Sequence, residues 1–398
     1  MTAAPTMLAR AGIVAIALVI AWRIMQVNAV LYEDTGRPRL PTPRAGALGA
    51  DAQSEALAQV LRANPAQVAA LLVMAREAEA RSRPEAARRA YEAAYQLAPL
   101  DREVLAADAE FLLRQGDVSG ALVLFDRLAE AFPEARERAF PVLGEILAAP
   151  EHAAAWNAVA ARKPAWLGPF LAASCARGVE PSLLVPLFLK RVKDAQAAPA
   201  EGACLVERLR NAERWDEAYQ VWLNTLPRDR LSDVGYVYNG SFEYAPGGTG
   251  FDWVLSRRPE RETGFSVEIA QAAGAVGKRA LRVSYAAKRQ AGSPLMQYLA
   301  LRPGRYELSG FGRPSGITTG RGVHWTVRCV STGKPQAAIA ASERFVGSSE
   351  WRRFTFEITV PEACRGQLLQ LEPVGVEEGP AFVSGTVWFD DLVLRRIG

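Results

Sequence analysis

Residues 65–99 read PAQVAALLVMAREAEARSRPEAARRAYEAAYQLAP, and residues 99–133 read PLDREVLAADAEFLLRQGDVSGALVLFDRLAEAFP. The two stretches share one organisation at a spacing of 34 residues, which Pro65, Pro99 and Pro133 mark. In each stretch, apolar residues recur at helical spacing on both sides of a short break. The pattern therefore predicts two consecutive pairs of antiparallel helices.

Small and aromatic residues fall at equivalent places in the two units. The small residues let the two helices of a pair approach closely, and the aromatic residue fills the space beneath them. They are Ala75, Ala87 and Tyr91 in residues 65–99, and Ala109, Ala121 and Phe125 in residues 99–133. On these positions residues 65–133 resemble the tetratricopeptide repeat, although Asp108 stands where that family usually has an apolar residue. Residues 134–230 are expected to continue as irregular helix pairs, one of which includes Trp215–Trp222.

The resemblance implies an all-α solenoid over residues 51–234. The concave surface of such a solenoid binds a protein partner. A spacer that only sets the distance from a membrane is the alternative interpretation. Neither interpretation makes this region an enzyme.

From residue 235 onward the sequence changes to short alternating or β-branched runs, separated by turns that contain Gly and Pro. This organisation is typical of an all-β sandwich. Strands are expected at residues 279–285, 295–301, 304–313, 324–330, 351–360, 367–371 and 385–394.

Two motifs bracket this β region: Asn239–Glu243 read NGSFE, and Val387–Leu394 read VWFDDLVL. With the segments between them, they resemble the galactose-binding-like jelly roll of the 4/9-type carbohydrate-binding modules. The resemblance implies that Glu243, with Asp390 or Asp391, holds a structural calcium ion, which is bound by oxygen ligands. Hydrogen-bonded or solvated turn carboxylates are the alternative.

Sugar recognition requires aromatic faces that stack on the sugar ring and polar groups that bind its hydroxyls. The candidate ligand-binding aromatics are Trp253, Tyr298, Tyr306, Trp325 and Trp351, with Gln297 and Arg328 as polar neighbours. For any single one of these aromatics, alternation along the strands favours core packing over ligand contact.

The four cysteines are Cys175, Cys204, Cys329 and Cys364, and no two of them have the spacing of a redox or zinc motif. They fall two in the helical region and two in the β region. Pairing within each region predicts the disulfides Cys175–Cys204 and Cys329–Cys364. Such bonds form in an oxidising compartment, which for a bacterial protein is the periplasm or beyond. Four buried thiols are the alternative.

Residues 11–22 form an apolar run between Arg10 and Arg23. Extended to residues 7–32, this segment predicts a single membrane-spanning anchor. A cleaved signal peptide or a buried soluble helix is the alternative. The expected order is an anchor or signal peptide at 1–32, a linker at 33–50, the helical repeat at 51–234 and the β-sandwich at 235–398.

Several function classes have little support in this composition. Lys and Arg outnumber Asp and Glu by only 47 to 43, which predicts no nucleic-acid partner. The two histidines, His152 and His324, have no metal-ligand spacing, and no hydrolase or nucleotide-binding motif is present. The sequence therefore predicts no catalytic residue and no required cofactor, with calcium as the one metal that the resemblance implies.

The expected protein is a single-pass inner-membrane protein of bacteria with its bulk in the periplasm. Its architecture resembles that of repeat proteins associated with O-antigen or exopolysaccharide assembly. That resemblance implies a non-enzymatic scaffold whose sandwich contacts glycan or an assembly partner. A purely protein-binding scaffold is the first alternative. A glycan-active enzyme is the second, and it would need two carboxylates in a cleft.

Overall fold

The computed structural model describes residues 50–398, apart from residues 196, 198, 275, 291, 319–320, 332 and 376–381. The chain forms two compact units, which divide between Trp166 and Leu167. The predicted anchor or signal peptide at residues 1–32 lies outside the described residues, as does the predicted linker up to residue 49. In the described part of the chain, no helix combines the length and the apolar composition that a membrane span requires.

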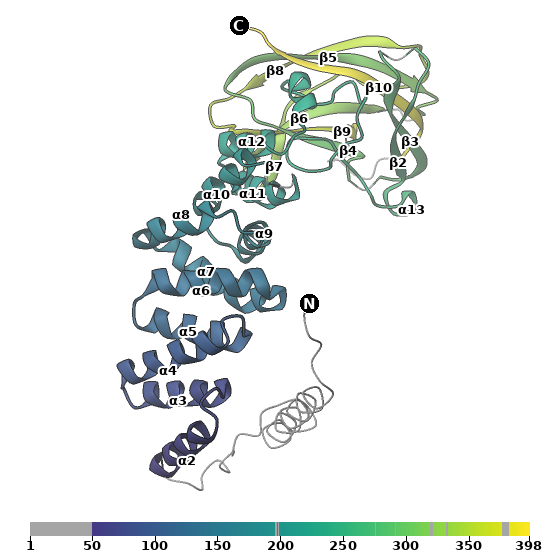
Figure 1. Ribbon diagram of the computed structural model, residues 1–398. Helices are drawn as coiled ribbons and strands as arrows, with labels where there is room; N and C mark the ends of the chain where they lie inside the picture. Colours follow the sequence, from purple (N-terminus) through teal and green to yellow (C-terminus); the bar gives the residue numbers. More distant parts are fainter. Residues whose placement is uncertain are drawn as a thin grey trace, which may run out of the picture. The chain divides into compact units, whose positions relative to one another are not determined.

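The described part of the first unit is all helical, and its helices follow one another as a stack (Figure 1). They are α2 (Ala50–Ala63), α3 (Val68–Ala80), α4 (Pro84–Leu97), α5 (Arg102–Arg114), α6 (Val118–Ala131), α7 (Arg136–Ala148) and α8 (Ala153–Ala161). Side-chain caps set two of the starts: Asp101 Oδ1 accepts hydrogen bonds from backbone N–H groups of α5, and Asp117 Oδ1 accepts one from α6. Pro84 occupies the first position of α4, where its missing N–H costs nothing.

Helices α3 and α4 pack as an antiparallel pair, and so do α5 and α6. The small residues of the repeated pattern are fully buried at these contacts: Ala75, Ala87, Ala109 and Ala121. The Tyr91 ring lies 5.0 Å from the Phe111 ring, centroid to centroid, and so joins the first pair to the second. The predicted all-α region is confirmed in this unit.

The second unit begins with four more helices: α9 (Leu167–Arg177), α10 (Pro181–Lys193), α11 (Pro199–Asn211) and α12 (Trp215–Leu223). The disulfide Cys175–Cys204 joins α9 to α11 and confirms the predicted pairing. Arg191 and Glu201 form a largely buried ion pair between α10 and α11, with Nε and Oε2 at 2.8 Å.

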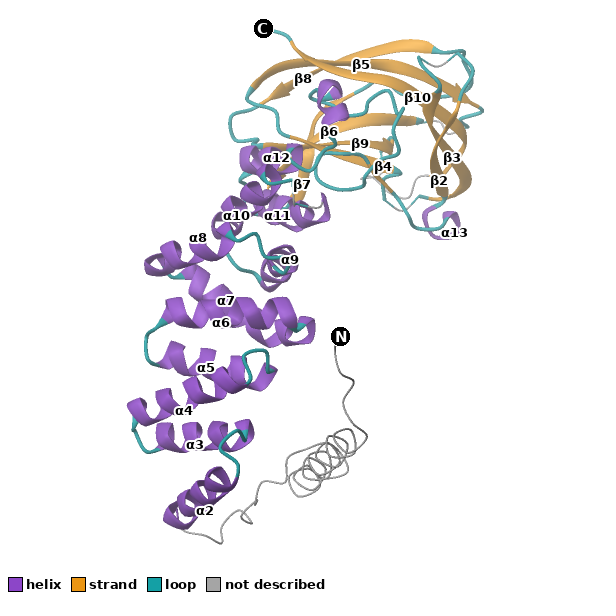
Figure 2. Ribbon diagram, in the orientation of Figure 1, coloured by secondary structure: helices purple, strands orange, loops and turns teal. Residues whose placement is uncertain are grey.

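Two antiparallel sheets of five strands each complete the second unit, and they confirm the predicted β-sandwich (Figure 2). The strands are β1 (Val254–Leu255), β2 (Phe265–Gln271), β3 (Arg279–Arg289), β4 (Leu295–Leu299), β5 (Gly304–Ser315), β6 (Val323–Ser331), β7 (Lys334–Ala341), β8 (Arg352–Val360), β9 (Gly366–Pro373) and β10 (Phe382–Arg396). A short helix, α13 (Glu260–Thr263), precedes β2. One sheet has the order β1-β4-β9-β6-β7, and the other has the order β2-β3-β10-β5-β8.

Alternate residues of both sheets point inward and form one apolar core, as the pattern of β5 shows, where every second residue from Tyr306 to Pro314 is buried. The disulfide Cys329–Cys364 joins β6 to the turn before β9, which confirms the second predicted pairing.

Helix α12 packs its aromatic face against the sandwich. The Trp222 ring lies 5.6 Å from the Phe251 ring and 5.2 Å from the Tyr238 ring, and the Trp215 ring lies 6.1 Å from the Tyr298 ring, all between centroids. The predicted domain boundary at residues 234 and 235 therefore runs between segments that are packed together.

Candidate functional site

Three of the predicted ligand-binding aromatics are core residues. Trp253 and Trp325 are fully buried with their rings 5.8 Å apart, and Trp325 also meets Phe389 at 5.1 Å. Tyr306 is buried as well, and its hydroxyl donates a hydrogen bond to the carbonyl of Arg302. These rings hold the two sheets together and are not available to stack on a sugar, in line with the core packing that strand alternation favours.

Gln297 and Tyr298 also have structural partners. The buried Gln297 amide accepts a hydrogen bond from Tyr238 N and donates one to Tyr238 O, which ties the segment before the sandwich to β4. Tyr298 points away from the core, but the Arg210 guanidinium lies 3.8 Å from the centre of its ring and Trp215 packs beside it. Helices α11 and α12 therefore occupy the surface that Tyr298 would offer to a ligand.

Arg328 belongs to a polar cluster on the outer face of the β6–β9 pair. Its Nη2 lies 2.9 Å from Glu372 Oε1, and Gln370 Nε2 donates to Glu372 Oε2 at 2.7 Å. Burial lowers the pKa of the neighbouring His324, which favours its neutral form. The cluster is nearly closed to solvent, because the Arg328 and Glu372 side chains are only about one tenth exposed.

The predicted calcium ligands lie close together, and two of them bind a turn of the backbone. Glu243 Oε1 accepts hydrogen bonds from Lys278 N and Arg279 N at 2.7 and 3.0 Å. Asp390 is buried, and its carboxylate accepts from Val276 N and from Asp391 N. Burial is the main cause that raises the pKa of Asp390 to about 6, and the nearby Asp391 and Glu243 raise it further.

Backbone N–H groups, rather than a cation, are the partners that the structure shows for these carboxylates. Calcium takes six to eight oxygen ligands, whereas N–H groups of the 276–279 turn and of Asp391 point at oxygens of Glu243 and Asp390. Among the described residues, no group of three or more His, Cys, Asp or Glu side chains is placed to hold a metal ion. The described geometry matches the alternative of hydrogen-bonded turn carboxylates.

A row of charged and aromatic side chains crosses the outer face of the β2-β3-β10-β5-β8 sheet. Strand register places four of its members side by side: Glu268 on β2, Arg282 on β3, Trp388 on β10 and Arg313 on β5. The fifth member, Trp351, lies just before β8, and its ring contacts Arg313. We call these five residues the Arg–Trp row. Successive side chains of a strand point to opposite faces, and the neighbours Val387 and Phe389 are both buried in the core. Trp388 therefore faces outward.

Guanidinium groups and indole rings alternate along the Arg–Trp row. The Arg313 Cζ lies 5.1 Å from the centre of the Trp351 ring and 5.3 Å from that of Trp388, and Arg282 lies 5.5 Å from the Trp388 ring on its other side. These separations are those of cation–π contacts. Both indoles are half-buried, so each still presents part of its surface to solvent.

Polar groups flank the Arg–Trp row on one side and an aromatic residue flanks it on the other. Ser284 and Thr386 are hydrogen-bonded across β3 and β10, with 3.1 Å between their hydroxyl oxygens, and Thr386 is paired with Ser315 of β5. On the other side, Phe311 is half-buried next to Arg353 of β8. Hydroxyls, arginines and partly exposed aromatic rings thus share one sheet face.

Of the Arg–Trp row, the sequence identified only Trp351 as a candidate. The alternation of Val387, Trp388 and Phe389 could have shown that Trp388 points outward. The two arginines beside it could not have been found in this way, because their position depends on the pairing of β3 and β5 with β10.

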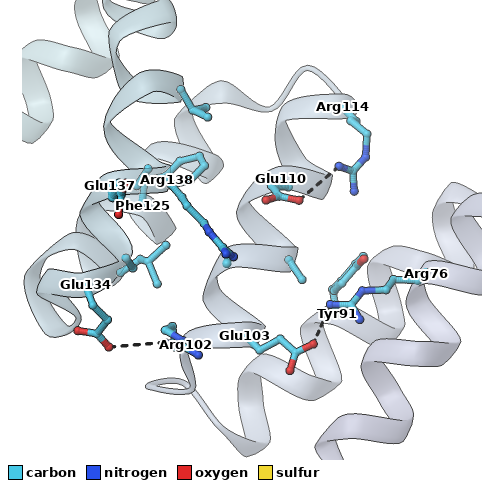
Figure 3. A pocket seen from close by; sticks show the side chains of 16 residues that line it. Arg76, Tyr91, Arg102, Glu103, Glu110, Arg114, Phe125, Glu134, Glu137 and Arg138 are labelled. Carbon is cyan, nitrogen blue, oxygen red and sulfur yellow. Dashed lines mark hydrogen bonds and ion pairs between the residues drawn. The ribbon is translucent and has the colours of Figure 1, made fainter. Parts of the chain in front are cut away.

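A second candidate site is a pocket of about 830 Å³ in the first unit, lined mainly by α5 and α7 (Figure 3). Three of its arginines have carboxylate partners: Arg76 with Glu103, Arg102 with Glu134, and Arg114 with Glu110 and Glu79. Arg138 extends from α7 into the pocket, and none of the described carboxylates forms an ion pair with it. Apolar side chains, among them Leu128 and Val142, also line the pocket.

Neither a protein-family model nor a curated protein matches this chain. Several solved structures are similar to its β region. A structure described as "CBM4 structure and function" is 16% identical, covers 40% of this chain and 99% of its own, and has a TM-score of 0.30. The CBM22-1 xylan-binding domain of Paenibacillus barcinonensis Xyn10C is 17% identical over 40% of this chain and 92% of its own, with a TM-score of 0.26. TmCBM61 in complex with beta-1,4-galactotriose is 16% identical over 41% of this chain and 99% of its own, with a TM-score of 0.26.

Proposed function

We propose that the protein is a non-enzymatic binding protein whose β-sandwich contacts a glycan through the Arg–Trp row. One observation carries this proposal: Trp351 and Trp388 are both partly exposed on one sandwich face, with Arg313 between them. Aromatic surface packs against the apolar faces of sugar rings, and hydroxyls such as those of Ser315 and Thr386 bind sugar hydroxyls. A face built in this way holds a ligand without any catalytic group.

The helical unit takes the role of a protein-binding scaffold in this proposal. Its paired helices and their buried alanines support a tetratricopeptide-like repeat, and the pocket offers apolar side chains beside Arg138, which pairs with none of the described carboxylates. A purely protein-binding scaffold, in which the sandwich binds no sugar, is the second candidate function. It is favoured by this pocket, which lies entirely within the first unit.

The proposed cellular setting is the periplasmic face of a bacterial inner membrane, with residues 7–32 as the anchor and a part in assembling cell-surface polysaccharide. The two disulfides support an oxidising compartment. Membrane fractionation of the full chain with a protease-protection assay tests this setting. Recovery in the soluble fraction, or protection of the bulk from a protease added to the periplasm, would count against it.

Glycan binding is tested with the full chain, oxidised and in mild detergent, on a panel of bacterial and plant polysaccharides. Trp351→Ala and Trp388→Ala should each lower binding at least tenfold. Phe382→Ala is the matched control, because Phe382 is an aromatic residue of the same strand that is 60% exposed. It lies six residues before Trp388, about 20 Å along the strand.

The two candidate functions give opposite results in this experiment. Saturable binding that both tryptophan variants weaken and Phe382→Ala leaves unchanged would establish a glycan-binding sandwich. Absence of binding to every polysaccharide on the panel would leave the protein-binding scaffold. The next step would then be to identify the protein that copurifies with the wild-type chain and is lost with Arg138→Glu.

A further inference from the structure

Arg313 is held in place by aromatic rings and has no acidic partner among the described residues. Its guanidinium lies between the Trp351 and Trp388 rings, at 5.1 and 5.3 Å from their centres. Arg282, the other arginine of the row, is paired with Glu268, whose Oε1 lies 3.1 Å from its Nη1. In the part of the chain that the structure describes, no carboxylate forms such a pair with Arg313.

From this difference we infer that the Arg–Trp row selects a glycan that carries carboxylate groups, with Arg313 as the group that binds the carboxylate. The inference rests on the proposed glycan-binding function and names its ligand class. A planar guanidinium matches a carboxylate with two parallel N–H···O hydrogen bonds. The two indoles restrict the tilt of the guanidinium, so its N–H groups are oriented before the ligand arrives.

A second arginine close to the row agrees with an anionic ligand. Arg353 is the outward residue of β8 next to Arg313, at a diagonal position where Cα atoms are about 7–8 Å apart. It is exposed, and none of the described carboxylates pairs with it. Glu350 is the nearest acidic residue in sequence to Trp351, and it forms no ion pair with Arg313 among the described contacts. A uronate chain bound to Arg313 that leaves the row toward β8 would meet Arg353 next.

Carboxyl reduction provides the matched ligand. It converts each uronate residue of a polysaccharide into the neutral sugar and leaves the backbone unchanged. The probes are polygalacturonate, alginate and hyaluronan oligosaccharides, each beside its carboxyl-reduced form. Affinity of the oxidised full chain is measured by calorimetry at low and at moderate salt, because salt screens exposed charges. We expect at least one acidic form to bind tenfold or more tightly than its reduced form, with this preference shrinking as salt rises.

Three arginine variants identify the residue that recognises the acid. Arg313→Gln should remove the preference for the acidic form, whereas Arg313→Lys should retain part of it, because lysine keeps the charge but lacks the planar fork. Arg261→Gln is the control, since Arg261 is exposed on α13 and has no ion pair with a described carboxylate. Thermal unfolding of each variant shows whether the fold is intact, and Arg353→Gln replaces Arg313→Gln if the latter does not fold.

The outcomes separate this inference from the proposed function. Equal affinity for acidic and reduced forms, or an unchanged preference in Arg313→Gln, would overturn the inference and leave glycan binding standing. Binding to none of the six probes would also overturn it, while binding to a neutral polysaccharide of the wider panel would preserve the proposed function. If the chain binds neither the six probes nor any neutral polysaccharide of the panel, both the inference and the proposed function are overturned.

Discussion

The Trp215 ring of α12 lies directly on the backbone of Gly366 in β9, so closely that a β-carbon at position 366 would overlap the ring. Helix α12 could not pack on this sheet in the same position if residue 366 carried a side chain, because that side chain would overlap the Trp215 ring. The contact fastens the last helical pair to the outer face of the β1-β4-β9-β6-β7 sheet. The helices are thereby part of the unit that contains the sandwich.

Replacement of this glycine should loosen the helical pair. We expect Gly366→Ala to lower the free energy of unfolding of the second unit by about 1–3 kcal/mol, the usual cost of overpacking. The Trp215 ring is rigid and also packs edge-on against Phe251 and beside Tyr298, which limits its movement away from residue 366. Denaturant unfolding followed by tryptophan fluorescence measures the effect.

Gly235→Ala serves as the control for that substitution. Gly235 is exposed, and an added β-carbon there would meet only the Val237 carbonyl oxygen at 3.4 Å, an ordinary contact. We expect its unfolding midpoint to stay close to that of the wild type. A Gly366→Ala chain as stable as Gly235→Ala would mean that Trp215 does not rest on β9 in solution.

Asp108 makes the stability of the helical unit depend on pH. Burial in α5, together with the nearby Glu92, raises its pKa to about 6, well above the ordinary value for aspartate. Between about pH 4 and pH 6 the folded state therefore binds more protons than the unfolded state. The stabilisation is complete below pH 4 and is lost as the pH rises through 6.

Asp108→Asn should remove this loss, because asparagine carries no charge at any of these pH values. At pH 7 to 8 we expect the variant to be more stable by about 1–3 kcal/mol, and at pH 4 the difference should vanish. Urea unfolding of both chains at the two pH values, followed by circular dichroism, measures the difference. A variant that is no more stable than the wild type at pH 8 would contradict the assignment. The pKa of Asp390, in the second unit, is raised in the same way. The stability of the second unit should therefore still fall as the pH rises in the Asp108→Asn chain.

The disulfide Cys329–Cys364 constrains the sandwich, since it closes a segment with a sequence separation of 35 residues. Replacing both cysteines with serine should lower the unfolding free energy by about 3–4 kcal/mol in the chain-entropy model. Thiol titration of the denatured wild-type chain should detect four thiols after reduction and none before. Detection of free thiols in the unreduced chain would refute the pairing.

Calcium removal tests the carboxylates at the 276–279 turn. Because oxygens of Glu243 and Asp390 accept backbone N–H groups, we expect chelation to leave the thermal midpoint unchanged. Glu243→Ala should lower the unfolding free energy by about 1–3 kcal/mol with or without calcium, since it leaves two N–H groups without their acceptor. A midpoint that rises with added calcium in the wild type, and not in Glu243→Ala, would instead establish the metal site that the jelly-roll resemblance implies.

The aromatic candidates illustrate which part of the site the sequence could not predict. Alternation within a strand indicates that neighbours face opposite ways, but it does not say which way is inward. Core packing is favoured for any single candidate, but only the closure of the two sheets over Trp253 and Trp325 shows that these two are core residues. Tyr298 does face outward, and it is unavailable because residues 210 and 215, far from it in sequence, cover it.

By itself, the sequence determined the features that depend on local spacing: the helix pairs at the 34-residue repeat and the strands and turns after residue 235. Local hydrogen bonds and side-chain periodicity carry that information. Only the tertiary structure decided that α12 packs on Gly366 and that Arg282, Trp388, Arg313 and Trp351 stand side by side. Both depend on strand register and on contacts between distant segments, which the core fixes only when the whole unit has folded.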